Sequence, residues 1–90
     1  MKNLSIVVYG KVQGVNFRHY TREQALELDV KGFVMNRDDG TVYIEAEGTA
    51  DQLESLIEWC RKGPARAAVT KVETTDGVVK NYSSFEVRRF

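Results

Sequence analysis

A short glycine-containing segment, residues 10–18, has the residue types and spacing of an anion-binding loop. Its sequence is GKVQGVNFR, and it lies between a β-rich stretch and a helical one. Backbone N–H groups at such a turn lack intrahelical partners, and a glycine that can adopt positive φ allows several of them to converge on an anion. Arg18 adds a planar guanidinium that can bind two phosphate oxygens at once. The segment predicts a phosphate-binding cradle, although a Gly-x-x-x-Gly turn before a helix is common in other contexts.

The segment does not match the Walker A motif of nucleotide-binding proteins. That motif requires Gly-x-x-x-x-Gly-Lys-Ser/Thr, whereas Gly10 and Gly14 are four residues apart and are followed by Val15 and Asn16. The phosphate-binding lysine and the hydroxyl group that holds Mg²⁺ are therefore missing. We expect no nucleotide–magnesium site in this loop.

The hydrophobic pattern predicts alternating strands and helices around the segment. Alternating apolar residues indicate strands, and apolar residues at helical spacing indicate helices. The expected elements are a strand over 4–9, a helix over 17–29, strands over 30–36 and 41–47, a helix from Thr49 to Gly63, a weaker strand over 67–74, a loop over 76–84 and a terminal strand over 85–90. Thr49 and Gln52 have the spacing of a capping box, and Gly63-Pro64 is a typical helix end.

This β-α-β-β-α-β order, with one short extra strand, predicts the α+β class. The order is that of the ferredoxin-like α/β sandwich, in which an antiparallel sheet carries both helices on one face. Because the turn signals fall at intervals suited to short connections, we expect residues 1–90 to form a single domain. The fold alone assigns no function, since it occurs in enzymes, RNA-binding proteins and ligand sensors.

Charge and composition exclude several classes of function. Thirteen basic and thirteen acidic side chains give a formal net charge of zero, so the chain lacks the overall positive field of a non-specific nucleic-acid or membrane binder. Cys60 is the only cysteine, which excludes an intramolecular disulfide and a cysteine-based zinc site. The apolar runs are far shorter than the ~20 residues that span a bilayer. We therefore expect a cytoplasmic protein with no nucleic-acid or membrane partner.

The acylphosphatase family has motifs that this sequence resembles over nearly its whole length. The similarity lies in three stretches, Gly10-x-Val12-Gln13-Gly14-Val15-x-Phe17-Arg18, Gly32-x-Val34-x-Asn36 and Asp39-Gly40-x-Val42. The resemblance implies an enzyme that hydrolyses the carboxyl–phosphate bond of small acyl phosphates to a carboxylate and inorganic phosphate. It also implies that no metal ion or other cofactor takes part, and we expect a monomer.

The resemblance also implies which residues form the site. Arg18 and Asn36 would be catalytic, with Asn36 positioning the attacking water. Phosphate would be bound by Arg18 and by the backbone amides of Gln13, Gly14, Val15, Asn16 and Phe17. Such a site suits the chemistry, because the leaving carboxylate is a weak base that needs no general acid, and phosphoryl transfer depends mainly on positioning and electrostatic stabilisation. Asn16 departs from the family pattern, which has glycine or an aromatic residue there, and we expect it to tune loop rigidity or helix entry.

Other candidate residues have simpler structural explanations. Asn36 could instead cap the hairpin that follows it, an alternative that the residue types alone would favour. Asp38 and Asp39 fit a tight turn better than a metal site, because no third ligand accompanies them. His19 lies off the predicted buried face of its helix, and Cys60 lies on the apolar face of the next one. We expect a solvated histidine and an inert core thiol.

A non-catalytic anion-binding or RNA-binding module on the same fold is the alternative function. Lys31-Gly32-Phe33-Val34 resembles the start of an RNP1 motif, but Val34 and Met35 occupy positions at which further aromatic residues would be needed. The zero net charge also disfavours RNA binding. A third possibility is an acylphosphatase-like domain of a larger carbamoyl-processing protein; the length of 90 residues favours a free-standing enzyme.

Overall fold

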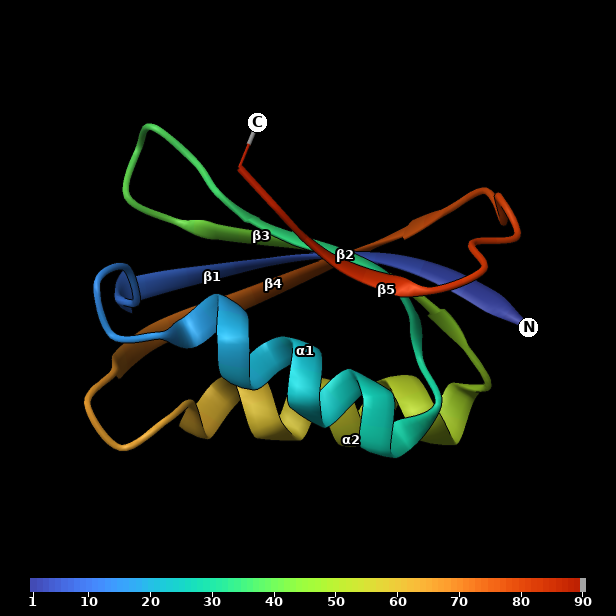
Figure 1. The fold of residues 1–90 in the computed structure, drawn as a ribbon, viewed down its shortest axis with the longest axis horizontal. Coiled ribbons are helices and arrows are strands. Elements are labelled where there is room, and N and C mark those ends of the chain that lie inside the picture. Colours follow the sequence, from blue (N-terminus) through green and yellow to red (C-terminus); the bar gives the residue numbers. More distant parts are fainter. Residues whose placement is uncertain (90) are drawn as a thin grey trace.

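The strands and helices expected from the hydrophobic pattern are present in the computed structural model, which describes residues 1–89. The elements are β1 (Lys2–Lys11), α1 (Phe17–Leu28), β2 (Lys31–Asn36), β3 (Val42–Gly48), α2 (Ala50–Lys62), β4 (Ala68–Gly77) and β5 (Phe85–Arg88). Both helices cover one face of the sheet (Figure 1), which confirms the ferredoxin-like α/β sandwich. Neither α1 nor α2, the helices found within residues 1–89, has the length and apolar composition that spanning a lipid bilayer requires.

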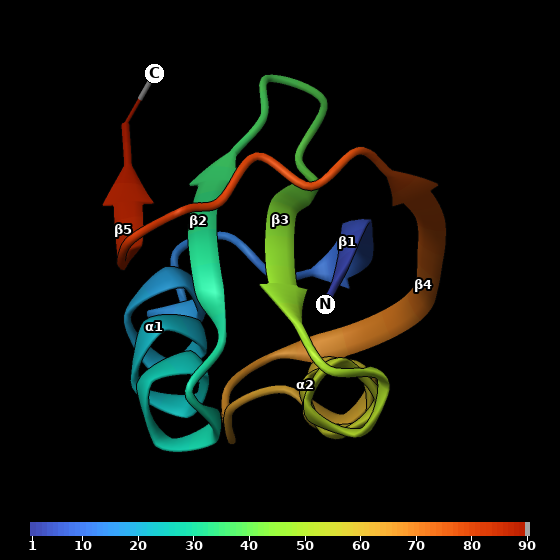
Figure 2. The same cartoon turned by 90° about the vertical axis from the view of Figure 1, so that its right-hand side faces the viewer.

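The sheet differs from the expected antiparallel arrangement at one strand pair. Its strand order is β4-β1-β3-β2-β5, and β5 pairs with β2 in parallel whereas the other pairs are antiparallel. The cause is the 78–84 segment, which leaves β4 at one edge and crosses the helix-free face to the opposite edge (Figure 2). β4 is also longer than the expected 67–74 strand, because it pairs with β1 as far as Gly77, opposite Asn3.

Apolar side chains between the sheet and the helices form the core. The fully or nearly fully buried members include Ile6, Val8, Val12, Val15, Phe17, Ala25, Val34, Val42, Ile44, Ala46, Leu53, Leu56, Ile57, Cys60 and Phe85. Two of them, Val12 and Val15, belong to the loop between β1 and α1, and they are 1% and 6% exposed. The core therefore anchors the predicted phosphate-binding loop at two points.

The helix-free face of the sheet carries two buried carboxylates that hold the 78–84 segment in place. Glu45 accepts hydrogen bonds from Lys80 Nζ at 2.6 Å and Tyr82 Oη at 2.7 Å. Glu47 accepts from the backbone N–H groups of Lys80 and Tyr82, and Asn3 Nδ2 donates to both carboxylates. Burial acts to raise the pKa of each glutamate, but these hydrogen bonds outweigh burial and leave both pKa values lowered. The network fixes the crossing and thereby the position of β5 beside β2.

Candidate active site

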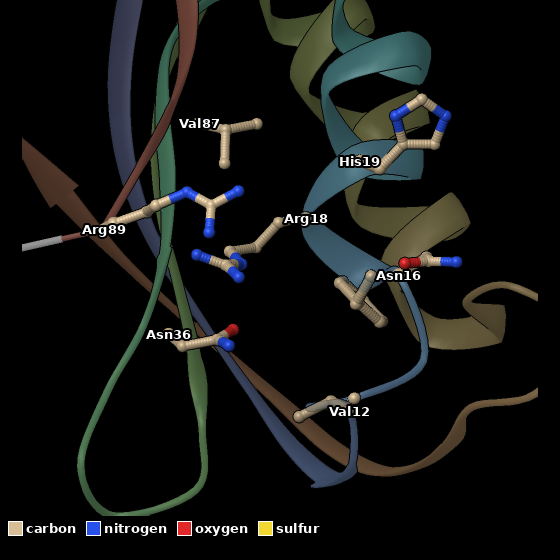
Figure 3. Close-up of a pocket in the computed structure, with 9 residues that line it drawn as sticks. Val12, Asn16, Arg18, His19, Asn36, Val87 and Arg89 are labelled. Carbon is tan, nitrogen blue, oxygen red and sulfur yellow. The ribbon is translucent and has the colours of Figure 1, made fainter.

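A depression of about 300 Å³ lies where the β1–α1 loop, the first turn of α1, the end of β2 and the end of β5 meet (Figure 3). Its lining consists of Val12, Gly14, Asn16, Phe17, Arg18, His19, Asn36, Val87 and Arg89. The structure thus brings Arg18 and Asn36 to one site, although they lie on different elements. Of the other predicted phosphate-binding residues, Gly14, Asn16 and Phe17 line the depression, whereas Gln13 and Val15 belong to the same loop without lining it.

Two residues with positive φ shape the loop before α1. Gly14 has φ 74°, and Asn16, the N-cap of α1, has φ 61° and ψ 28°. Asparagine tolerates this left-handed conformation better than most side chains do, so the departure from glycine at this position is compatible with the same backbone path. The Asn16 side chain makes no capping hydrogen bond and points away from Arg18 (Figure 3). The structure places Asn16 at the entry of α1, and its expected effect on loop rigidity or helix entry stays a prediction.

The first turn of α1 favours an anion at the depression. N–H groups of a first helical turn have no intrahelical acceptors, and the helix dipole places partial positive charge at this end. The first turn of α1 contains no acidic residue that would already neutralise that charge. Arg18 adds a full positive charge to the same turn, so the local potential is suited to a phosphate group even though the chain has zero net charge.

The guanidinium of Arg18 is held by the end of β5. Its Nη1 donates a hydrogen bond to the backbone carbonyl of Arg88 at 3.3 Å. The side chain is half-buried and extends from α1 across the depression toward Asn36 (Figure 3). An arginine has five N–H donors in a planar fork, so one bond to a carbonyl leaves several donors for a bound anion.

Asn36 is the last residue of β2, and its carboxamide points into the depression (Figure 3). The hairpin that follows is closed without its side chain, because Asp39 Oδ1 accepts from Thr41 N at 3.0 Å and from Thr41 Oγ1 at 2.6 Å. These two hydrogen bonds also lower the pKa of Asp39. Asp39 therefore has the turn role predicted for it, and the alternative of Asn36 as a hairpin cap is not what the structure shows.

Gln13 connects the loop to the hairpin that bears Asn36. Its side-chain Nε2 donates to the backbone carbonyls of Arg37 at 2.7 Å and Thr41 at 2.9 Å. The sequence interpretation used only the backbone amide of Gln13, and this side-chain role was missed because both acceptors lie more than twenty residues away. The two bonds connect the predicted phosphate-binding loop to the hairpin that follows Asn36 and so limit the distance between the loop and Asn36.

Arg89 is a second residue that the interpretation of the sequence did not assign to the site. It was expected only as part of the terminal strand, yet its side chain is directed into the depression from the end of β5 (Figure 3). The alternation of Val87 and Arg89 along that strand is the signal that could have placed both on one side. Phe90, the last residue of the expected terminal strand, lies outside the described residues.

His19 and Cys60 match their expected structural roles. His19 is exposed at the rim, its imidazole points away from Arg18 (Figure 3), and its Nε2 lies 3.7 Å from Glu23. Cys60 is fully buried, and burial raises the pKa of its thiol to about 12. No group of three or more His, Cys, Asp or Glu side chains within residues 1–89 is arranged to hold a metal ion.

Comparison with known proteins gives consistent results for sequence and structure. The family model described as Acylphosphatase matches residues 4–87. The chain is 44% identical to an acylphosphatase of Thermotoga petrophila over 90 residues, which is 100% of both chains. The crystal structure of acylphosphatase from Bacillus subtilis superposes with a TM-score of 0.95 at 35% identity, covering 98% of this chain and 99% of that one. An acylphosphatase structure from Coxiella burnetii gives a TM-score of 0.93 at 42% identity, covering 97% and 92%.

The family-model match includes the loop, the first turn of α1, β2 and most of β5, and Arg89 is the one described lining residue of the depression that lies beyond it. These similarities support acyl phosphate hydrolysis as the activity and give no support to the alternative of a non-catalytic anion-binding or RNA-binding module. With the family model covering nearly the whole chain and relatives matched over their full length, the chain belongs to the acylphosphatase family.

Proposed function

We propose that this enzyme hydrolyses the carboxyl–phosphate bond of small acyl phosphates in the depression shared by Arg18 and Asn36, releasing a carboxylate and inorganic phosphate. The observation that carries the proposal is the convergence of an anion-binding helix N-terminus, a tethered guanidinium and a neutral carboxamide at one depression. This combination offers strong electrostatic stabilisation and a group that can orient water, and those are the two requirements of phosphoryl transfer.

The loop and Arg18 would hold the phosphoryl group. Positive φ at Gly14 and Asn16 turns the backbone so that amides between Gln13 and Phe17 can converge on one anion. Arg18 would bind two phosphoryl oxygens and stabilise the charge that spreads over the equatorial oxygens in the transition state. Electrostatic stabilisation by fixed N–H donors and a guanidinium can replace that of a metal ion, so we propose that the reaction proceeds without a metal or organic cofactor.

Asn36 would position the water molecule that attacks phosphorus. Its carbonyl oxygen can accept a hydrogen bond from water and its amide can donate one, but the carboxamide is too weakly basic to remove a proton. The water oxygen forms the new bond to phosphorus while the bond from phosphorus to the acyl oxygen breaks, and the carboxylate leaves with that electron pair. The proton from water passes to a phosphoryl oxygen of the substrate, so the enzyme itself supplies no general base.

The leaving group explains why a site with so few ionisable groups is sufficient. A carboxylate is a weak base and departs without protonation, so no general acid is required. His19 is the only histidine of the chain, and its imidazole points away from Arg18, which would hold the phosphoryl group (Figure 3). Esters of phosphoric acid with poorer leaving groups would therefore be hydrolysed far more slowly.

We also propose that residues 1–90 act as a single-domain monomer in the cytoplasm with small acyl phosphates and inorganic phosphate as its ligands. The loop, Arg18 and Asn36 converge within one chain, so the proposed reaction requires no residue from a second copy. The balanced net charge supports the absence of a nucleic-acid partner, because such binding depends on neutralising many phosphates.

The test follows benzoyl phosphate hydrolysis by its loss of absorbance in EDTA, with p-nitrophenyl phosphate as the ester control. Arg18→Ala should weaken inorganic phosphate binding and lower kcat/KM by roughly 10³-fold, because the arginine contacts the phosphoryl group in the ground and transition states. Asn36→Ala should leave phosphate binding nearly unchanged and lower kcat by about 10²–10³-fold. Arg22→Ala, which removes an exposed arginine of α1 outside the depression, is the matched control.

The assignment of the two roles would be wrong if Asn36→Ala abolished phosphate affinity while sparing turnover. It would also be wrong if Arg18→Ala behaved like Arg22→Ala. Equal hydrolysis of the anhydride and the ester would contradict the argument from the leaving group.

A further inference from the structure

Arg89 supplies a second guanidinium to the depression, and the activity described above does not require it. Val87 in β5 and Arg89, which directly follows β5, both line the depression, as expected for residues two apart in an extended chain. Arg88, between them, faces the opposite side, and its guanidinium lies 4.0 Å from the centroid of the Phe33 ring. The two neighbouring arginines therefore have different environments, and only the side chain of Arg89 can reach a ligand in the depression.

The charges around the depression favour more than one anionic group. Of the nine described residues that line it, two carry a guanidinium, Arg18 and Arg89, and none is acidic. A guanidinium stays protonated at any pH at which a protein is folded. The loop amides and Arg18 can already neutralise one phosphoryl group, so the charge of Arg89 is left for a second anionic group.

In-line attack places the acyl group on the side of Arg89. The water held by Asn36 must approach phosphorus opposite to the leaving oxygen, because the attacking and leaving oxygens are roughly in line. The acyl group must therefore extend away from Asn36. Figure 3 shows the guanidinium of Arg89 directed into the depression on the side of Arg18 that faces away from Asn36. Arg89 is also exposed, as expected for a residue at the open side of the depression.

We infer that Arg89 is a specificity-determining residue that binds an anionic group on the acyl portion of the substrate. The enzyme accordingly prefers acyl phosphates that carry a carboxylate or other anion beyond the reacting bond. This inference rests on the proposed placement of the phosphoryl group at Arg18 and of water at Asn36. Arg18 donates a hydrogen bond to the backbone carbonyl of Arg88, the residue next to Arg89. This bond limits the distance between the guanidinium groups of Arg18 and Arg89.

The experiment compares two aromatic acyl phosphates that differ in one charge, 4-carboxybenzoyl phosphate and 4-carbamoylbenzoyl phosphate. Their para substituents have nearly the same shape, and neither can reach the reacting bond of its own molecule. In the wild-type enzyme, kcat/KM should be about tenfold higher for the carboxylate substrate. A factor of this size is near the lower end of what a hydrogen bond to a charged group contributes. Arg89→Gln should reduce this ratio to about one, and Arg89→Glu should reverse the preference.

Arg22→Gln is the control for long-range electrostatics. It removes one positive charge from an exposed position one helical turn beyond Arg18, outside the depression, and it should keep the wild-type preference. The inhibition constant of inorganic phosphate should also be unchanged in Arg89→Gln, because the phosphoryl group is bound elsewhere. Thermal unfolding of each variant checks that the fold is retained.

Three results would overturn the inference and leave the proposed function standing. The first is a wild-type ratio near one, with both substrates hydrolysed, which would leave the proposed function intact. The second is an equal loss of activity toward both substrates in Arg89→Gln together with weaker phosphate inhibition, which would make Arg89 a phosphoryl ligand. The third is that Arg22→Gln lowers the ratio of the two kcat/KM values as much as Arg89→Gln does, which would indicate that the preference comes from the overall positive potential rather than from Arg89. Absence of hydrolysis of either substrate by the wild-type enzyme would instead contradict the proposed function and the inference with it.

Discussion

Replacing Gln13 with alanine should uncouple the phosphate-binding loop from Asn36. The substitution removes the hydrogen bonds of 2.7 and 2.9 Å from Nε2 to the carbonyls of Arg37 and Thr41. At about 0.5–1.5 kcal/mol each, the two bonds are worth about 1–3 kcal/mol, and the lower half applies because the site is only partly buried and water can reach the carbonyls. For a domain of this size, a loss of about 1–2 kcal/mol corresponds to a fall in Tm of about 4–16 °C.

The effect on catalysis should exceed the effect on phosphate binding. The loop keeps its anchors Val12 and Val15 in the core, so the amide cradle and Arg18 remain formed. The distance between the bound phosphoryl group and Asn36 is no longer fixed, and a displacement of about 1 Å can cost up to ~10²-fold in rate. We therefore expect kcat to fall by at least about tenfold while the inhibition constant of inorganic phosphate changes less than about threefold.

Steady-state kinetics with benzoyl phosphate, phosphate inhibition and thermal unfolding together measure these quantities. Gln24→Ala, a truncation of a half-buried glutamine of α1 outside the depression, controls for the general effect of removing such a side chain. A fall in Tm with unchanged kcat would show that Asn36 does not depend on this connection. A loss of phosphate affinity as large as the loss of kcat would show that Gln13 shapes the cradle instead.

Three further predictions concern the rest of the structure. Gly32 has φ +139°, and in Gly32→Ala a Cβ would lie 1.8 Å from the carbonyl oxygen of Glu45, so urea unfolding should show the free energy of unfolding lowered by about 3 kcal/mol or more. In the control Gly40→Ala, where the Cβ meets no atom within 4 Å, the loss should be about 1 kcal/mol. Glu45 and Glu47 have lower pKa values in the folded protein than their unfolded-state value of about 4.3, so their ionised forms stabilise the fold above that pH, and this contribution is lost as the pH falls through the folded pKa values. Thermal unfolding should therefore show Tm declining below about pH 4.3, and the decline should be less steep in Glu47→Gln. A colorimetric thiol reagent at pH 8 should leave Cys60 unreacted until urea unfolds the chain, because burial raises its pKa to about 12; prompt reaction of the native protein would contradict the structure.

Features that depend on neighbours in the chain could be predicted from the sequence. The capping box of α2 is one example, since Gln52 N donates to Thr49 Oγ1 at 3.2 Å and Thr49 N donates to Gln52 Oε1 at 2.8 Å, over three residues of sequence. Features that depend on distant pairing were less accessible. The extension of β4 to Gly77 follows from its pairing with β1, and a parallel β5 has the same alternation of residues as an antiparallel one.

The same distinction applies to the site. The local sequence around Gly14 and Arg18 predicts an anion-binding turn, because the chemistry of a strand-to-helix connection is local. The role proposed for Asn36 depended on the resemblance to a family, since its residue type and position alone favoured a hairpin cap. The side-chain role of Gln13 is a consequence of long-range packing, and no local pattern distinguished it from a solvated loop residue. Alternation could have placed Arg89 on the same side as Val87, but only the packing of the terminal segment beside the loop shows that this side faces the depression.

The site depends on both faces of the sheet, although it lies on only one side of it. On the helix side, Val12 and Val15 anchor the loop in the core. On the other face, Glu45 and Glu47 bind the 78–84 segment, and that segment determines where β5 pairs with β2. The end of β5 then supplies the carbonyl that holds Arg18. Because a loose phosphoryl-transfer transition state is stabilised by positioning rather than by acid–base groups, the mechanism proposed above requires both anchors to be rigid. In that mechanism the buried carboxylates of the helix-free face would act as positioning residues that do not touch the substrate.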